Sequence, residues 1–234
     1  MRALAVPFCE HLGYWRGMEK TGFTILLGGN LSVTERVRKA ADGTRVIAAD
    51  NGMRHAQPLS LTPELWVGDF DSTDTTLLTE WPDVERHTFP ASKAATDGEI
   101  AVSQAIERGA QSLVLIGALG GDRTDHAFQH MLNAISLKEK GYDVTLLSGE
   151  EEAYPLVSGG EKALDLPAGS LFSVLGFSDL DGLDIENARY PLNDYSLTFG
   201  TSRTISNVAE GPVRFSLKSG RAIILARPYD MTGA

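Results

Sequence analysis

The fold is indicated most clearly by residues 23–49, which read FTILLGGNLSVTERVRKAADGTRVIAA. Two apolar runs, at residues 23–27 and 45–49, flank a segment in which apolar residues recur at helical spacing. A strand, a helix and a second strand in this order are typical of a βαβ unit, in which the two strands lie parallel in one sheet. The sequence therefore predicts that a parallel α/β fold begins here.

The pattern changes along the chain, and the change separates two domains. Before about Gly149, further short apolar runs predict strands at residues 65–67, 113–116 and 144–147. After Gly149 the runs are separated by glycines and show no helical spacing, and they lie at residues 171–175, 196–199, 213–217 and 222–226. We therefore predict an N-terminal parallel-sheet α/β domain followed by a smaller C-terminal all-β domain.

The expected boundaries follow the same change of pattern. The acidic, glycine-containing stretch after Gly149 is typical of a linker. We expect an N-terminal extension at residues 1–22, an α/β domain at residues 23–149, a linker at residues 150–160 and the all-β domain at residues 161–234.

Three helices of the first domain carry recognisable signals. The pairs Ser32 with Glu35 and Thr96 with Glu99 have the spacing of a capping box, which marks a helix start. A third helix is predicted to end at Gly141. Its apolar residues fall at positions i, i+3, i+4 and i+7, which predicts a buried face made of Phe128, Met131, Leu132 and Ile135.

Composition excludes several classes of protein. The 234 residues carry a formal net charge of −10 and no block of Lys and Arg, so a nucleic-acid-binding surface is not expected. No apolar run approaches the ~18 residues that a transmembrane helix needs. The single cysteine, Cys9, excludes an intrachain disulfide framework and suits a reducing compartment. We expect a cytoplasmic protein.

Ligands of open parallel sheets bind outside the carboxyl ends of the strands, so polar residues that directly follow apolar runs are candidates for a site. Gly29 and Asn30 follow the first run, where glycine allows close backbone approach and a helix start favours an anion. Asp50 and Asn51 follow the second run. The alternative for the segment with Gly29 is a tight turn that needs glycine. The alternative for Asp50 is a helix N-cap.

Two carboxylates after the third run suggest a metal site. Asp69 and Asp71 are two residues apart, a spacing that places both side chains on one face of an extended segment, close enough to share a hard cation. Buried carboxylates repel one another unless a cation lies between them. The alternative is a solvated turn.

Two further segments complete the expected site. Lys93 precedes a helix start and Asp97 lies in its first turn, although both have a purely structural alternative. Residues 117–126 combine glycines with Arg123, and backbone N–H groups together with a guanidinium suit phosphate oxygens. His126 lies at the helix start in this stretch, where a histidine is more often structural than catalytic. One interpretation accounts for all of these segments: the carboxylates bind Mg²⁺, and Mg²⁺ binds a nucleotide polyphosphate. This interpretation makes phosphoryl-type transfer the leading reaction class.

Taken in order, these motifs resemble the thiamine pyrophosphokinase (thiamin diphosphokinase) family. The resemblance rests on motifs spread from residue 23 to residue 226, at residues 50–52, 67–72, 89–99, 117–126, 190–192 and 202–207. It implies a C-terminal β-sandwich and a homodimer whose active site lies between the N-terminal domain of one subunit and the C-terminal domain of the other. It also implies transfer of the pyrophosphoryl group of ATP to the hydroxyl of thiamine, giving thiamine diphosphate and AMP.

The resemblance also implies roles for individual residues. Asp50, Asp69, Asp71 and Asp97 would surround Mg²⁺ and the ATP phosphates. As a separate mechanistic hypothesis, whichever of Asp71 and Asp97 is not fully engaged by the metal would accept the alcohol proton. Substrate-binding residues would be Gly29, Asn30, Asp50, Asn51, Lys93, Thr96, Arg123, Asp125 and His126, with Ser206 and Asn207 in the thiamine pocket. The chain departs from the family pattern at Ala94, at Asp122 and at Val208.

Three alternatives stay open from the sequence. Asp69, Asp71 and Thr73 also satisfy the Asp-x-Asp-x-Thr motif of a haloacid-dehalogenase-like phosphatase, in which Asp69 would be a covalent nucleophile. A pyrophosphokinase acting on another small alcohol, such as a hydroxymethylpterin, would keep the metal site and change the pocket. The third alternative is a nucleotide-binding protein without catalytic activity, which only Ala94 supports.

Overall fold

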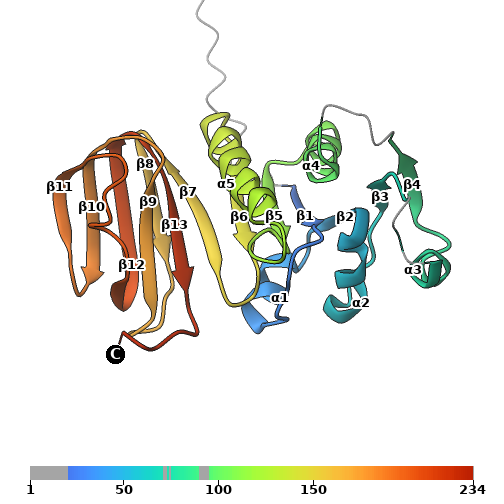
Figure 1. The fold of residues 1–234 in the computed structure, drawn as a ribbon, viewed down its shortest axis with the longest axis horizontal. Helices are drawn as coiled ribbons and strands as arrows, with labels where there is room; N and C mark the ends of the chain where they lie inside the picture. The colour runs from blue at the N-terminus through green and yellow to red at the C-terminus, as the bar shows by residue number, and fades with distance from the viewer. Residues whose placement is uncertain (1–20, 71–72, 74, 90–94, 234) are drawn as a thin grey trace, which may run out of the picture.

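The computed structural model describes residues 21–70, 73, 75–89 and 95–233. Within these residues, hydrogen bonds join the strands into one sheet in the order β11-β10-β12-β9-β13-β7-β6-β5-β1-β2-β3-β4, with β8 paired to β12 (Figure 1). The half from β6 to β4 is parallel and carries the helices, and the half from β7 to β11 is antiparallel. The predicted fold class is confirmed.

The parallel half confirms each strand that the sequence predicted for the α/β domain. Its strands are β1 (Gly22–Leu26), β2 (Arg45–Ala49), β3 (Leu65–Gly68), β4 (Glu85–Thr88), β5 (Ser112–Ile116) and β6 (Asp143–Leu147). The edge strand β4 was not predicted, because its sequence, ERHT, is polar and mostly exposed. It pairs with β3 through backbone hydrogen bonds, which need no apolar side chains.

Helices cover both faces of the parallel half. They are α1 (Glu35–Ala41), α2 (Ala56–Leu59), α3 (Thr75–Glu80), α4 (Asp97–Glu107) and α5 (Thr124–Glu139), with a 3₁₀ helix η1 (Asp50–His55) after β2. One core packs α4 and α5 against Phe23, Ile25 and Ile47. A second core packs α1, η1 and α2 against Leu26 and Trp66 on the opposite face.

The capping predictions are half right. Thr96 and Glu99 form the predicted capping box at the start of α4. At α1 the prediction is wrong, because Thr34 is the N-cap and accepts a hydrogen bond from the Val37 amide. The Ser32 hydroxyl instead donates to Glu150, so it ties the β1–α1 loop to the turn after β6.

The predicted buried face of α5 is rotated. Ile135 is buried as expected, but its buried companions are Ala134 and Leu137, whereas Phe128 is 50% exposed and Leu132 is 39% exposed. Phe128 stacks against Phe177 of the antiparallel half, with ring centroids 5.7 Å apart. The apolar spacing therefore located the helix correctly but not the side of it that faces the sheet.

The antiparallel half is a β-sandwich. Its strands are β7 (Glu152–Val157), β8 (Gly160–Leu164), β9 (Leu171–Gly176), β10 (Leu180–Ala188), β11 (Leu192–Leu197), β12 (Asn207–Ser219) and β13 (Arg221–Arg227). The long strand β12 pairs with β9 at its start and with β8 and β10 along the rest, so it belongs to both layers. Phe172, Leu183 and Phe215 lie in the core between them.

Residues 150–160, which we expected to form a linker, contain β7. This strand pairs with β6 on one side, with Leu147 opposite Glu152, and with β13 on the other. The buried Glu152 accepts two hydrogen bonds from Arg36 of α1 and one from the Tyr154 hydroxyl. The two halves are thus joined by backbone pairing and a buried ion pair, and the domain boundaries themselves stay a prediction.

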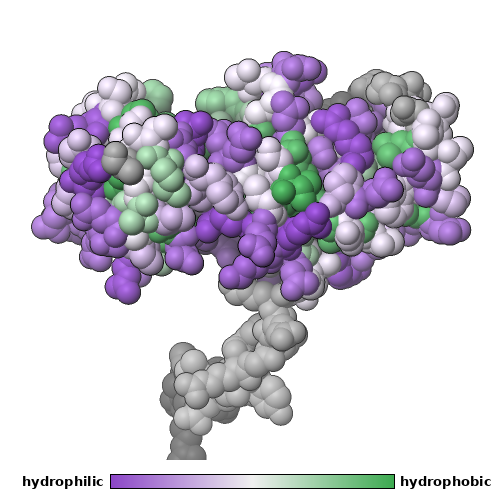
Figure 2. Space-filling view, turned by 90° about the horizontal axis from the view of Figure 1, so that it is seen from below, coloured by the Kyte–Doolittle hydropathy of each residue, from purple (hydrophilic) through white to green (hydrophobic). Residues whose placement is uncertain are grey.

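The surface is mostly hydrophilic on the face that Figure 2 shows, and hydrophobic residues form small patches there. Among the described residues, no helix combines the length and the apolar character that crossing a membrane requires.

Candidate active site

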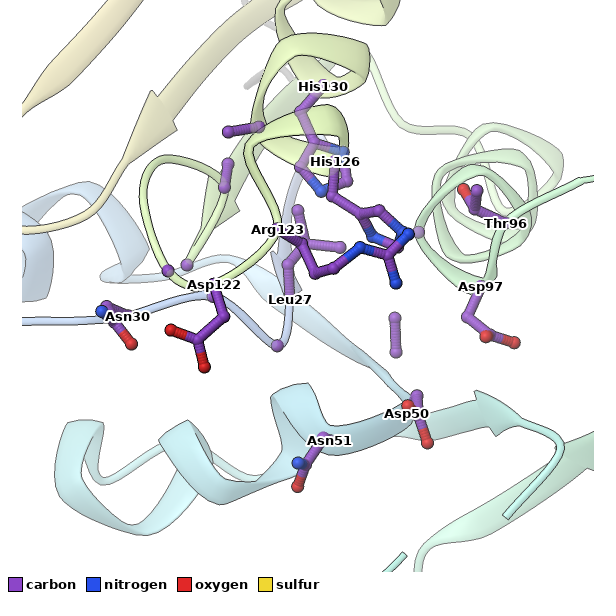
Figure 3. Close-up of a pocket in the computed structure, with 18 of the residues that line it drawn as sticks. Leu27, Asn30, Asp50, Asn51, Thr96, Asp97, Asp122, Arg123, His126 and His130 are labelled. Atoms are coloured by element: carbon purple, nitrogen blue, oxygen red, sulfur yellow. The ribbon is translucent and has the colours of Figure 1, made fainter. Parts of the chain in front are cut away.

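A cavity of about 690 Å³ opens at the carboxyl ends of β1, β2, β3 and β5 (Figure 3). Its wall contains the starts of α4 and α5, the start of η1 and the two glycine turns that follow β1 and β5. It brings together most of the candidates, namely Gly29, Asn30, Asp50, Asn51, Asp69, Thr96, Asp97, Arg123 and His126. The remaining candidates lie elsewhere and are considered below.

Asp50 is held by the backbone conformation at the end of β2. It has a left-handed φ of 44°, and its carbonyl accepts a hydrogen bond from the Trp66 indole at 2.8 Å. Ala49 is the N-cap residue of η1 and Asp50 is its first residue, so the N-cap alternative does not hold for Asp50. Burial raises the pKa of Asp50 above its ordinary value, and the negative charges of Asp97 and Asp69 raise it further.

Three carboxylates from three different segments therefore act on one another electrostatically. Asp69 directly follows β3, and Asp97 is the first residue of α4. Such an arrangement attracts a cation. Among the described residues, no three His, Cys, Asp or Glu side chains are close enough together to hold a metal ion by themselves. Asp71 and Lys93, which the sequence also proposed, lie outside the described residues.

The glycine turns touch one another, which explains why glycine stands there. The Gly29 amide donates to the Gly117 carbonyl at 3.1 Å. A Cβ atom on Gly29 would lie 2.4 Å from that carbonyl oxygen, and one on Gly117 would lie 2.4 Å from the Leu27 carbonyl oxygen. The tight-turn alternative is therefore correct for Gly29, and the turn also lines the cavity.

Arg123 and Asp125 form a bidentate ion pair at the start of α5. The Arg123 Nε and Nη2 atoms donate to the two Asp125 carboxylate oxygens at 2.9 and 2.7 Å. This pairing lowers the pKa of Asp125 well below its usual range. Arg123 lines the cavity and Asp125 does not. In Figure 3 the Arg123 side chain extends from α5 toward the side of the cavity on which Asp97 and Asp50 lie.

Several lining residues were missed by the sequence reasoning. Asp122, noted only as a departure from the family pattern, lines the cavity beside Arg123, and so does Glu99. His130 lies one helical turn after His126, and burial and the His126 charge lower its pKa to about 4. The i, i+4 spacing of the two histidines was the available signal. Arg54 was also missed, since nothing in the sequence places η1 against the β1 turn.

Ser206 and Asn207 do not line the cavity of this chain. Asn207 is 5% exposed, and its amide is engaged with the backbone of Tyr190. Ser206 is exposed and has a left-handed φ of 57°. Asn207 therefore supports the β10–β11 turn, whereas Ser206 presents its side chain to the surface.

Comparison with known proteins agrees with this architecture. The model of the thiamin pyrophosphokinase catalytic domain matches residues 38–146, and the model of the thiamin pyrophosphokinase vitamin B1 binding domain matches residues 163–222. A thiamine pyrophosphokinase of Bacillus subtilis (strain 168) is 28% identical over 195 residues, which cover 79% of this chain and 87% of that protein.

Solved structures share the fold. The crystal structure of the Bacillus subtilis thiamine pyrophosphokinase superposes with a TM-score of 0.78 at 22% identity, covering 88% of this chain and 99% of that chain. The thiamin pyrophosphokinase of Geobacillus thermodenitrificans gives a TM-score of 0.75 at 22% identity, covering 92% of this chain and all of that chain (100%). Together the two family models match more than half of the sequence. The chain belongs to the thiamin pyrophosphokinase family.

Proposed function

We propose that the cavity binds ATP and that the chain catalyses pyrophosphoryl transfer to thiamine. The thiamine hydroxyl oxygen bonds to the β-phosphorus of ATP, the bond from this phosphorus to the α–β bridging oxygen breaks, and AMP leaves with that oxygen. The products are thiamine diphosphate, AMP and the hydroxyl proton. The observation that carries the proposal is the convergence of Asp50, Asp69, Asp97 and Arg123 on one cavity, in a chain of this family.

The donor set of the cavity fits a hard divalent cation. The cavity wall offers carboxylate oxygens, which Mg²⁺ prefers, and burial together with the negative charges of Asp97 and Asp69 raises the pKa of Asp50. Asp50, Asp69, Asp71 and Asp97 would hold Mg²⁺. When bound, the ion would neutralise charge on the polyphosphate as the bridging bond breaks. Asp71 or Asp97 would accept the proton of the thiamine hydroxyl.

Two cavity elements would position ATP. The touching turns at Gly29 and Gly117 let the backbone approach the phosphates closely, and the start of α5 brings Arg123 to the same place. Holding the alcohol and the β-phosphorus in line is worth up to ~7–11 kcal/mol in favourable systems, more than general-base help contributes. The chain's own contribution is therefore mainly positioning.

Thiamine would be bound between two copies of the chain. Ser206 does not line the cavity, so a second copy would have to bring its C-terminal half to the ATP site. Within the matched vitamin B1 binding segment, Tyr190 and Phe199 are the described aromatic residues whose large side chains are exposed, each at 63%. Either ring offers an apolar face to the thiazolium cation. The active enzyme would accordingly be a homodimer.

A cytoplasmic location is supported by the cysteine content. The sequence has one cysteine, so its stability does not depend on an intrachain disulfide and it suits a reducing compartment. Fractionation of cells that make the protein tests this proposal.

The phosphatase alternative has less support. In that class of enzyme the aspartate motif follows the first strand, whereas Asp69 follows β3, and a C-terminal sandwich has no role in it. Incubation with ATP, Mg²⁺ and thiamine, followed by chromatography, separates the functions. Thiamine diphosphate with AMP supports the proposal. Phosphate release from phosphomonoesters, transfer to a hydroxymethylpterin alone, or nucleotide binding without turnover would each contradict it.

A further inference from the structure

Arg54 reaches back from η1 to the turn that follows β1. Its Nη2 atom donates to the Gly28 carbonyl at 2.7 Å and to the Gly29 carbonyl at 3.1 Å. The side chain lines the cavity and is exposed. Because both of these bonds come from Nη2, the Nε and Nη1 donors of the guanidinium make no hydrogen bond with the described residues.

Among the described residues that line the cavity, negative side chains outnumber positive ones. The described lining has two guanidinium groups, Arg54 and Arg123, against five carboxylates, which are Asp50, Asp69, Asp97, Glu99 and Asp122. Arg123 is already engaged by both oxygens of Asp125. Arg54 forms no ion pair with any described carboxylate, so its charge is available to a ligand.

The neighbouring His55 fixes the turn independently of Arg54. His55 is 8% exposed, and its Nε2 atom lies 2.9 Å from the Gly29 carbonyl oxygen. The Gly29 amide is bonded in turn to Gly117. The turn therefore keeps two contacts when the Arg54 side chain is shortened, and the carbonyls of Gly28 and Gly29 serve to orient Arg54 rather than the reverse.

We infer that Arg54 is a substrate-binding residue that uses its Nε and Nη1 donors to bind the polyphosphate of ATP. The Nε and Nη1 hydrogens point to different sides of the guanidinium, so each offers a single charge-assisted hydrogen bond to a phosphate oxygen. A guanidinium already held by two carbonyls loses little entropy when it forms these bonds. The inference rests on the proposed function, since it names a contact to the same substrate. It identifies Arg54 as a positively charged side chain of the cavity that the sequence motifs did not reveal.

Binding measurements on the full chain test the inference. The probes are α,β-methylene-ATP with Mg²⁺, which cannot undergo the transfer, and AMP. Arg54→Gln should weaken binding of the ATP analogue about 10- to 100-fold, the range expected for hydrogen bonds to a charged group. AMP carries fewer phosphate charges and should lose clearly less affinity. Arg54→Lys keeps the charge but not the planar set of donors, and its affinity for the ATP analogue should lie between those of Arg54→Gln and the unchanged protein.

Arg38→Gln is the matched control. Arg38 is also exposed and its Nη2 also donates to a backbone carbonyl, that of Pro58, but it does not line the cavity. This variant should bind both probes normally. Equal losses for AMP and the ATP analogue in Arg54→Gln would show that Arg54 only supports the turn, and no loss would show that it does not act on the nucleotide; either result overturns the inference. Failure of the unchanged protein to form thiamine diphosphate would instead overturn the proposed function.

Discussion

The side-chain amide of Asn207 is bonded to both backbone groups of Tyr190. Its Oδ1 atom accepts from the Tyr190 amide at 3.1 Å, and its Nδ2 atom donates to the Tyr190 carbonyl at 2.9 Å. The Val208 amide donates to the same Oδ1 at 2.8 Å. With these three hydrogen bonds the side chain orients the turn from which the exposed Tyr190 ring projects.

Asn207→Ala should therefore act on thiamine through Tyr190. The amide of the buried Val208 and both backbone groups of Tyr190 would lose a hydrogen-bond partner, and we expect the free energy of unfolding to fall by about 1–3 kcal/mol. The KM for thiamine should rise while the KM for ATP stays unchanged. Chemical unfolding and steady-state kinetics measure these quantities. A rise in the KM for ATP of the same size would contradict this role.

Replacing Gly29 by alanine should disrupt the ATP site. The new Cβ would lie 2.4 Å from the Gly117 carbonyl oxygen and 3.0 Å from the Gly120 carbonyl oxygen, so the two turns must separate. We expect at least a tenfold loss of ATP affinity. Gly43→Ala is the control, because Gly43 has a φ of 68° with no atom within 4 Å of the added Cβ, and it should lower stability without changing ATP affinity.

Asp50→Asn tests the role of the carboxylates. The amide keeps the shape of the side chain and removes one negative charge from the group that includes Asp69 and Asp97. We expect kcat to fall by about two orders of magnitude or more and the Mg²⁺ concentration for half-maximal activity to rise. Asp83→Asn, a change at an exposed aspartate that does not line the cavity, should leave both unchanged. Normal Mg²⁺ dependence in the Asp50 variant would contradict the proposed metal site.

Much of this arrangement could be predicted from the sequence, and the exceptions have physical reasons. Asp50, Asp69 and Asp97 line one cavity as expected, since the ends of parallel strands and the starts of the following helices meet at one edge of a sheet. Arg54 could not be found, because its position depends on how η1 folds back toward the first turn. β7 was taken for part of a linker since its sequence begins in an acidic turn, although it is largely buried between β6 and β13.

Local signals also failed where tertiary contacts decided the outcome. Ser32 and Thr34 are both good N-caps, and the contact of Ser32 with Glu150 leaves Thr34 as the cap of α1. On α5, Phe128 stacks against Phe177 and does not pack on the sheet. Neither contact is encoded in helical spacing.

Stability should depend on pH through His130. Burial lowers its pKa to about 4 from an ordinary value of 6.5, so the folded state favours the neutral ring. The unfolded chain binds this proton below about pH 6.5 and the folded chain does not until about pH 4, so stability is present above pH 6.5 and is lost as the pH falls toward 4. Urea unfolding at pH 7.5 and pH 5 should show a smaller difference for His130→Gln than for the unchanged protein. An equal difference would contradict this assignment.

Breaking the ion pair between the two halves should be costly. Arg36→Met leaves the Glu152 carboxylate, whose side chain is 3% exposed, without its cation. We expect a loss of about 3 kcal/mol in the free energy of unfolding, and partial recovery when Glu152→Gln is added. Double-mutant unfolding experiments measure both. A loss below about 0.5 kcal/mol in the single variant would show that the pair behaves as a surface ion pair.

Transfer of a pyrophosphoryl group in one step moves the β-phosphorus of ATP to thiamine, so a label at this atom distinguishes it from other reactions. The protein is incubated with thiamine, Mg²⁺ and ATP labelled at the β-phosphorus, and the products are separated. We predict that the label appears in thiamine diphosphate and that AMP is unlabelled. Label retained in ADP alongside thiamine monophosphate, or released as inorganic phosphate, would contradict the account.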